Sequence, residues 1–285
     1  MIQKVIRIFF LACFICLISA VVYANDIKVS VSEVTDTRTT GQFFSGIELK
    51  LKVMGDVIAD AKGLKLRITK AVDDTGRNLL KDEKERTDFD EPDEYNIGQA
   101  EVRVKLKNPA RKATVIKELI GEMNLFVPKT DPNAIAIINK FMTQTGKTLS
   151  NTVLKASGVE VAVLTKSQYD EIKATKEKEV KDGTLAKEFG GAMIQAFSSL
   201  FGSMMEIGEN SVILHVKDPE SKVVAIEFID TSGKKIKNIS SMKMGDVKVF
   251  EFEKPIPQDA KITIYIATSK SLIKTPLKLT DIALP

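Results

Sequence analysis

The sequence contains no tryptophan, one histidine and two cysteines, and these absences exclude several kinds of site. Zinc is usually held by several histidine or cysteine ligands, so we expect neither a structural nor a catalytic zinc centre. No Gly-x-Ser-x-Gly motif accompanies the single histidine, His215, which disfavours a serine hydrolase. Aromatic residues make up 6% of the chain, which leaves few side chains for stacking on sugars and disfavours a glycoside hydrolase.

The N-terminus has the three parts of a secretory signal. Lys4 and Arg7 precede an apolar run over residues 8–22, and a small-residue cleavage site follows at Ala24. We expect residues 1–24 to be removed as a signal peptide, so that the mature protein is extracytoplasmic, either periplasmic or secreted. The run is shorter than the roughly 20 residues of a membrane-spanning helix, which disfavours an uncleaved anchor.

Cleavage after this run also removes Cys13 and Cys16, the two cysteines of the sequence. The mature protein then has no disulfide, no thiolate nucleophile and no cysteine ligand, so packing must stabilise it. Loss of Lys4 and Arg7 lowers the number of basic residues from 42 to 40, against 38 acidic residues. This balance is nearly neutral and no basic stripe with interleaved aromatic residues is present, so we expect no nucleic-acid partner.

Most of the remaining sequence alternates between apolar and polar residues with a period of two, which is typical of half-buried antiparallel strands. In the first part of the chain, the pattern covers residues 27–31, 47–53, 64–68, 101–107 and 119–127. Residues 134–138 suit a buried strand or a short helix, and we favour the strand. A further strand is expected at Val159, Val161 and Val163.

A charge-rich segment and an apolar segment interrupt the strands. Residues 165–183 begin with Thr-x-x-Gln and end with glycine, which predicts a solvated helix. Residues 185–207 place their apolar side chains on about half of the helical wheel, which predicts an amphipathic helix. We expect the two helices to form an insert over residues 165–208.

The strand pattern returns after the expected insert. It covers residues 212–216, 224–228, 247–252, 262–266 and 277–282. The sequence therefore predicts a mainly β protein of two antiparallel immunoglobulin-like β-sandwiches joined by a helical insert. The expected domains are residues 25–164 for the first sandwich, 165–208 for the insert and 209–285 for a smaller second sandwich.

The two expected sandwiches share one turn motif. Residues 73–77 are Asp-Asp-Thr-Gly-Arg, and residues 230–234 are Asp-Thr-Ser-Gly-Lys. Each motif follows an expected strand, and each contains a glycine that can take a positive φ angle. The pattern suits two copies of one fold, and it equally suits two unrelated hairpins that obey the same turn rules.

Further turn and strand motifs carry a resemblance to a known class of domain. Asn-Leu-Leu at 78–80 extends the first turn, and the motifs over residues 108–116 and 119–121 follow it. With these motifs, roughly residues 26–164 resemble β-sandwich domains of exported bacterial proteins of unassigned function. The resemblance implies a fold, leaves the function open and implies no catalytic residue.

Clustered carboxylates over residues 82–94 form the candidate metal site. Asp88, Asp90 and Asp93 lie close together in this loop, and calcium prefers such oxygen ligands. The loop lacks the glycine of an EF-hand, so we expect a weak calcium site at most and no other cofactor. A solvated charged loop is the alternative interpretation.

The amphipathic helix expected over residues 185–207 is the candidate interaction element. Its apolar face carries Phe189, Met193, Phe197, Leu200 and Met204. Three roles suit this face: packing between the sandwiches, self-association and contact with a membrane. The polar face has few basic residues, which disfavours the membrane, so we expect packing within the chain.

No recognisable catalytic site is present, so we expect a non-catalytic extracytoplasmic binding or envelope-assembly module. Its partner is an unknown protein or envelope component, and the sequence leaves the oligomeric state open. One alternative is a hydrolase that uses paired carboxylates, whose separation is a three-dimensional property. The other alternative is a membrane-active protein that acts through residues 185–207.

The expected cleavage site gives a direct prediction about the mature protein. Intact-mass spectrometry of the protein purified from its native host should give the mass of a chain that begins at Asn25. An Ala24→Leu variant should keep its signal, because the cleavage site requires a small residue. A wild-type mass that still includes Met1 would contradict the prediction.

Overall fold

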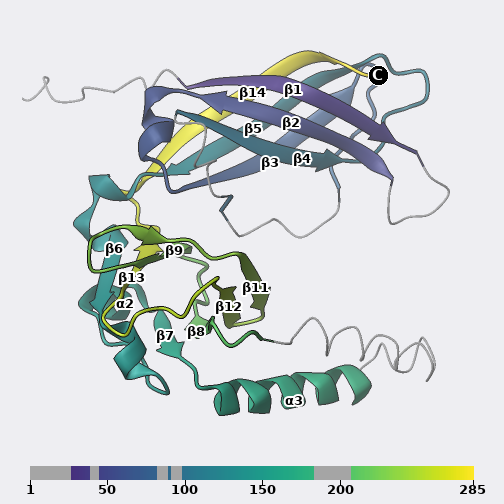
Figure 1. Cartoon of the computed structure of the whole chain (residues 1–285). Helices are drawn as coiled ribbons and strands as arrows, with labels where there is room; N and C mark the ends of the chain where they lie inside the picture. Colours follow the sequence, from purple (N-terminus) through teal and green to yellow (C-terminus); the bar gives the residue numbers. More distant parts are fainter. Residues whose placement is uncertain (1–26, 39–44, 82–88, 91–97, 183–206) are drawn as a thin grey trace, which may run out of the picture.

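The computed structural model describes residues 27–38, 45–81, 89–90, 98–182 and 207–285. The fold is mainly β, as predicted, with four antiparallel sheets and few helices. Figure 1 shows the sheets gathered into two units that lie one above the other. We call the upper one the terminal unit, because it contains both ends of the described chain, and the lower one the inserted unit.

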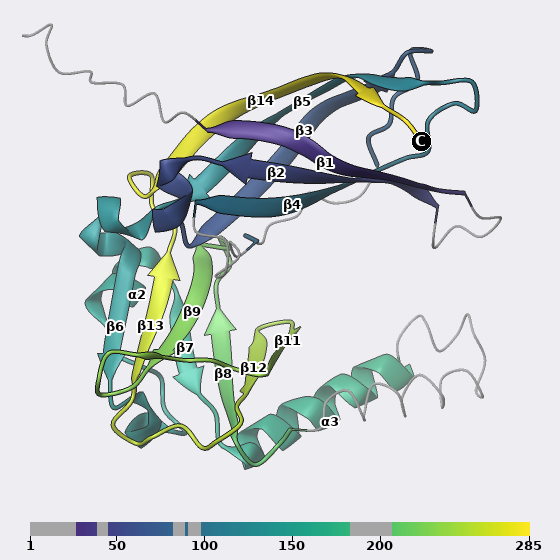
Figure 2. The same cartoon turned by 45° about the horizontal axis from the view of Figure 1, so that its top comes forward.

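The terminal unit contains two three-stranded sheets. Sheet A has the strand order β1–β2–β4, and sheet B has the order β14–β5–β3. Their strands are β1 (Lys28–Thr37), β2 (Gly46–Met54), β3 (Gly63–Asp73), β4 (Gln99–Leu106), β5 (Val115–Phe126) and β14 (Leu272–Ala283). The short helix η2 (Asp56–Asp60) connects β2 to β3. Figure 2 shows β14, in yellow, lying beside β5 along the whole sheet.

Alternating side chains explain why sheets A and B share an interior. In β2, Ile47, Leu49, Leu51 and Val53 are buried, whereas the residues between them are partly exposed. The first three of these side chains pack in one cluster with Leu119 of β5. The apolar faces of the two sheets therefore exclude water from each other, which is the main favourable term in folding.

The inserted unit contains two four-stranded sheets. Sheet C has the order β10–β9–β13–β6, and sheet D has the order β11–β12–β8–β7. Their strands are β6 (Ile135–Asn139), β7 (Glu160–Val163), β8 (Ser211–Lys217), β9 (Val223–Ile229), β10 (Lys235–Ile236), β11 (Ser240–Met244), β12 (Val247–Glu251) and β13 (Lys261–Ile266). The helices η3 (Pro128–Thr130), η4 (Pro132–Ala134), η5 (Phe141–Gln144) and α2 (Thr152–Ser157) flank β6.

Phe228 of β9 lies at the centre of the core of the inserted unit. Its ring contacts those of Phe141, Phe250 and Phe252, with centroid distances of 5.7, 5.1 and 5.0 Å. The same cluster contains Leu214 of sheet D, so sheets C and D share one interior. Tilted and edge-to-face aromatic contacts of this kind stabilise a core beyond the burial of their area.

The strand pairings cross the domain boundaries predicted from the sequence. Both β6 and β7 fall in the expected first sandwich, 25–164, but they pair with β13 and β8 of the inserted unit. The last strand, β14, falls in the expected second sandwich, 209–285, but it pairs with β5. The prediction was wrong here because alternation identifies a strand and its buried face without identifying its partner. The chain leaves sheet B after β5 and returns to it at β14.

The helical segment does not join the two units, contrary to the prediction. The helix α3 (Lys166–Asp182) follows β7 and precedes β8, which are neighbouring strands of sheet D. Its predicted start is confirmed: the backbone N–H of Thr165 donates to Gln168 Oε1 at 2.9 Å, and the backbone N–H of Gln168 donates to Thr165 Oγ1 at 3.2 Å. Tyr169 in the first turn is buried against Ile213 and Val249, so α3 is anchored to sheet D at this end.

Several predicted features lie outside the described residues. They are the signal peptide at 1–24, two of the three calcium candidates, Asp88 and Asp93, and the interaction residues Phe189, Met193, Phe197, Leu200 and Met204. These assignments stay predictions. Among the helices that the structure describes, none is both long and apolar enough to cross a membrane.

The motif shared by the two units forms the same turn twice. Asp73 and Asp230 each accept hydrogen bonds at one carboxylate oxygen from the backbone N–H groups two and four residues later, all at 2.9 Å. Gly76 and Gly233 then take φ angles of 86° and 87°, which glycine adopts without strain. The prediction of a turn at both positions is confirmed.

Candidate functional site

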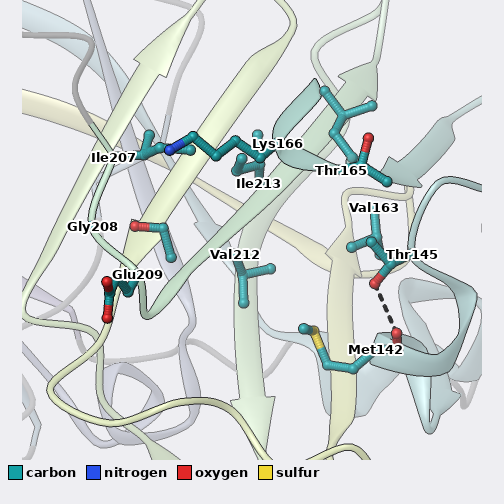
Figure 3. Close-up of a pocket in the computed structure, with 12 residues that line it drawn as sticks. Met142, Thr145, Val163, Thr165, Lys166, Ile207, Gly208, Glu209, Val212 and Ile213 are labelled. Atoms are coloured by element: carbon teal, nitrogen blue, oxygen red, sulfur yellow. Dashed lines mark hydrogen bonds between the residues drawn. The ribbon is translucent and has the colours of Figure 1, made fainter. Parts of the chain in front are cut away.

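A pocket of about 480 Å³ lies in the inserted unit, where α3 and β8 begin. Figure 3 shows its mixed lining, which includes the aliphatic residues Val163, Val212 and Ile213, and the hydrogen bond that Thr145 donates to the carbonyl oxygen of Met142 at 2.7 Å. The lining ends at Ile207, beyond which residues 183–206 lie outside the described chain. We therefore assign no ligand to this pocket.

A second pocket, of about 430 Å³, lies between the edge strands β1 and β14 of the terminal unit. Val31, Val34 and Leu279 line it, and all three are half-buried side chains of the core between sheets A and B. The charged residue in its lining, Glu33, forms an ion pair with Lys50. This pocket is an opening of the apolar core and not a set of converging polar groups.

A third pocket, of about 510 Å³, lies between the two units, and we call it the inter-unit groove. The terminal unit contributes Lys65, Phe89, Asn124, Leu272 and Lys274. The inserted unit and the segment that leads from it back to β14 contribute Pro219, Glu220, Ser221, Lys222, Ala267, Thr268 and Ser269. Ligand pockets occur preferentially at domain interfaces, and here polar groups also converge.

Three strands of sheet B form the floor of the groove. Asn124 of β5 is the register partner of Lys65 on β3 and of Lys274 on β14. Cross-strand partners point to the same face of a sheet, and Met123 and Leu125 on either side of Asn124 are buried in the core. Lys65, Asn124 and Lys274 therefore form one row on the outer face of sheet B.

The polar groups of this row are incompletely paired. Asn124 Nδ2 donates to Glu122 Oε1 at 3.3 Å, but its buried Oδ1 accepts no hydrogen bond from the described residues. Lys274 Nζ lies 3.8 Å from the same Glu122 oxygen. Lys65 is half-buried and forms no ion pair within the described part of the chain. The floor thus offers two ammonium groups to a ligand, beside one buried polar atom that lacks a donor among the described residues.

One wall of the groove is a tight loop of the inserted unit. The Asp218 carboxylate accepts hydrogen bonds from the backbone N–H groups of Lys222 at 2.9 Å and Val223 at 2.7 Å, which fixes the loop. Ser221 has a φ angle of 53°, a conformation that few residues other than glycine adopt. Lys222 Nζ lies 3.0 Å from Glu220, so these two charges largely neutralise each other.

The chain passes between the units at two crossings, residues 127–134 and 267–272, and the second of them forms another wall of the groove. The Thr268 hydroxyl donates to Asp131 Oδ2 at 2.7 Å, and this hydrogen bond between the crossings lowers the pKa of Asp131. The backbone N–H of Val127 donates to the carbonyl oxygen of Ser271 at 2.8 Å. Hydrogen bonds therefore hold the two crossings side by side.

Apolar packing continues from the groove into the junction of the units. The ring of Phe126 lies between those of Phe89 and Tyr265, with centroid distances of 6.4 and 6.3 Å. Gly63, in the same row of sheet B as Phe126, approaches Val224 so closely that a Cβ atom there would lie 2.4 Å from the valine Cγ1. The units are therefore packed against each other without space for a larger residue at Gly63.

A buried carboxylate completes the junction. Glu227 is 8% exposed, and it accepts hydrogen bonds from Lys62 Nζ at 2.8 Å and from the Tyr265 hydroxyl at 2.7 Å. Burial raises the pKa of Glu227, but the hydrogen bonds from Lys62 and Tyr265 outweigh this effect and bring it below the usual 4.5. Burial, and then the hydrogen bond to Glu227, raise the pKa of Tyr265. Lys62 belongs to the terminal unit, so this ion pair also links the two units.

The residues singled out from the sequence have different outcomes. Asp90 lies near the junction, where its backbone exchanges hydrogen bonds of 2.7 and 2.8 Å with that of Leu64. Within the described residues, no three His, Cys, Asp or Glu side chains are grouped to hold a metal, but Asp88 and Asp93 lie outside them and the calcium site stays a prediction. His215 is half-buried on the face of β8 opposite the core, as expected.

The chain matches no family model, no curated protein and no solved structure. The resemblance to exported β-sandwich domains therefore rests on the sequence motifs alone. What the inter-unit groove does must be inferred from its own residues.

Sequence reasoning missed the residues of the groove. Lys65, Asn124 and Lys274 occupy ordinary outward positions of three strands, and nothing in their order along the chain places them in one row. The third of these strands was expected in a different domain. A polar residue flanked by buried Met123 and Leu125 was visible in the pattern, but such positions usually face water.

The Glu227 network gives a prediction about stability and pH. Replacing Tyr265 by phenylalanine should lower the free energy of unfolding by about 1.5–3 kcal/mol at neutral pH, the usual value of a hydrogen bond to a charged group. The folded-state pKa of Glu227 lies below its unfolded value, so its stabilisation is present above about pH 4.5 and is lost as the pH falls through the folded pKa. Urea denaturation over this pH range measures both effects.

A Glu227→Gln variant is the control for this experiment. In that background, the cost of Tyr265→Phe should be smaller and independent of pH, because the acceptor no longer titrates. If Tyr265→Phe costs the same at neutral and at acidic pH in the protein with Glu227, the tyrosine acts through packing alone and the prediction is wrong.

Proposed function

We propose that this protein is a non-catalytic extracytoplasmic binding or envelope-assembly module that uses the inter-unit groove as its binding site. The observation that carries the proposal is the groove itself, about 510 Å³ in volume, to which both units contribute. Its floor presents Lys65, which forms no ion pair with the described residues, and contains the buried Oδ1 atom of Asn124, which has no donor among them. Extracytoplasmic location follows from the N-terminal signal, residues 1–24.

We also propose that each unit is an immunoglobulin-like β-sandwich. Antiparallel pairing throughout both units and the side chains shared between sheets A and B, and between C and D, support this assignment. Loops at the ends of such sandwiches are common recognition surfaces. The loop over residues 218–222, which precedes β9, would then be an end loop that faces the groove.

The carboxylates near the groove favour binding over hydrolysis. Glu227, Asp131 and Asp218 each accept hydrogen bonds from neighbouring groups of the protein, which gives them structural roles. Glu220 is the one acid among the described residues that line the groove. A hydrolase of the paired-carboxylate type needs two acids that face the substrate. The other alternative, membrane action through residues 185–207, concerns a segment outside the described chain.

Filling the groove tests this function. A Ser269→Trp variant places a large side chain at the exposed rim of the groove, and Ser241→Trp places the same side chain on β11, away from it. We expect the wild type and Ser241→Trp to sediment with isolated cell-envelope material, and Ser269→Trp to bind at least about tenfold more weakly.

Equal melting temperatures of the three proteins are the check on folding. If Ser269→Trp binds the envelope as well as Ser241→Trp does, the groove is not the binding site and the proposal fails.

A further inference from the structure

We propose that the inter-unit groove binds an anionic, hydroxylated ligand, namely a sugar that carries a carboxylate or a phosphate, and that Lys65 and Lys274 hold its anionic group. This inference rests on the proposed function, because it concerns the same groove, and it adds the chemical class of the ligand.

Charge gives the first argument. Among the described residues, the groove is lined by Lys65, Lys222 and Lys274 and by one acid, Glu220, which is already 3.0 Å from Lys222. The remaining two lysines flank Asn124 on the floor. An anion between them is attracted by both ammonium groups, and the partly enclosed site weakens the screening by water.

Glu122 offsets only part of the charge of these lysines. Its register partner on β3 is Arg67, whereas that of Asn124 is Lys65. Glu122 therefore lies in the next outward-facing row of sheet B, farther from the junction of the units than Asn124. The closest approach of Glu122 to Lys274 is 3.8 Å, which is longer than a hydrogen bond, and its side chain is 45% exposed. Exposed ion pairs of this kind contribute little, so an anion in the groove can compete for Lys274.

The unpaired amide of Asn124 gives the second, independent argument. Its Oδ1 is fully shielded from solvent and has no donor among the described residues, and buried polar groups without a partner are rare in folded proteins. If the amide oxygen and nitrogen of Asn124 are exchanged, the buried atom is an N–H donor that lacks an acceptor. A hydroxyl group that reaches this buried position satisfies either orientation, because it both donates and accepts. The groove therefore favours a ligand that carries hydroxyls beside its anionic group.

Apolar side chains of the groove suit the C–H face of a sugar ring. Phe89, Pro219 and Leu272 belong to its lining, and the contact between the rings of Phe89 and Phe126 holds the former in place. The backbone of β5, in the middle of the floor, is already paired on both sides, so a peptide strand cannot pair with it there. Recognition at the centre of the floor therefore depends on side chains.

Calorimetric titration of residues 25–285 with three matched ligands tests the inference. Glucuronate and glucose 6-phosphate carry an anion at the carbon where glucose carries a hydroxyl. We expect at least one of the two anions to bind at least about tenfold more tightly than glucose, and added salt to weaken this binding. The two anions distinguish a carboxylate from a phosphate ligand.

Variants then locate the binding. Lys65→Met and Lys274→Met should each weaken binding of the anionic ligand by about tenfold, and Asn124→Leu should weaken its binding through the lost hydrogen bond. Lys70→Met is the matched control, because Lys70 lies on β3 outside the groove and pairs with Glu118. The affinity of Lys70→Met for the anionic ligand should equal that of the wild type. Melting temperatures report whether each variant is folded.

The outcomes separate this inference from the proposed function. If neither anion binds more tightly than glucose, or if Lys70→Met weakens binding as much as Lys65→Met, the inference is overturned. If Ser269→Trp abolishes envelope binding while no anionic sugar binds, the groove recognises another chemistry and only the inference fails. If Ser269→Trp has no effect on envelope binding, the proposed function itself fails.

Discussion

The two crossings between the units are hydrogen-bonded to each other, and the arrangement of the rest of the molecule depends on this. Asp131 of the first crossing accepts a hydrogen bond from the hydroxyl of Thr268 in the second, and the backbone N–H of Val127 in the first donates to the carbonyl oxygen of Ser271 in the second. One crossing continues β5 and the other leads into β14, which are neighbours in sheet B. The inserted unit is thus attached at two adjacent points, which removes the freedom that a single linker would leave.

Packing at the junction and the groove follow from the same attachment. Glu227, Lys62 and Tyr265 form a hydrogen-bonded network beside the aromatic cluster, and a carboxylate so deeply buried would be costly without these partners. The second crossing and the loop over residues 218–222 also supply the walls of the inter-unit groove. The position of Lys65 relative to the inserted unit is therefore set by the contacts that fasten the two units together.

Sequence patterns predicted the local structure well and the long-range pairing poorly. Alternation located β2, β4 and β13, and the Thr165–Gln168 pattern located the start of α3, because these features depend on neighbouring residues. The same alternation in β14 suits a pairing with β5 or with any other strand, so the domain boundary was misplaced. The groove was not predictable for the same reason: its floor combines β3, β5 and β14, which become neighbours only through that pairing.

The central claim is that the two units form a single body with a fixed groove between them. Residues 25–285 contain no cysteine, so Ser30→Cys on β1 and Ser241→Cys on β11 provide two exposed sites for spin labels. Double electron–electron resonance should give one narrow distribution of distances between the labels. A broad distribution, or two separate ones, would show that the units move relative to each other and would contradict the account.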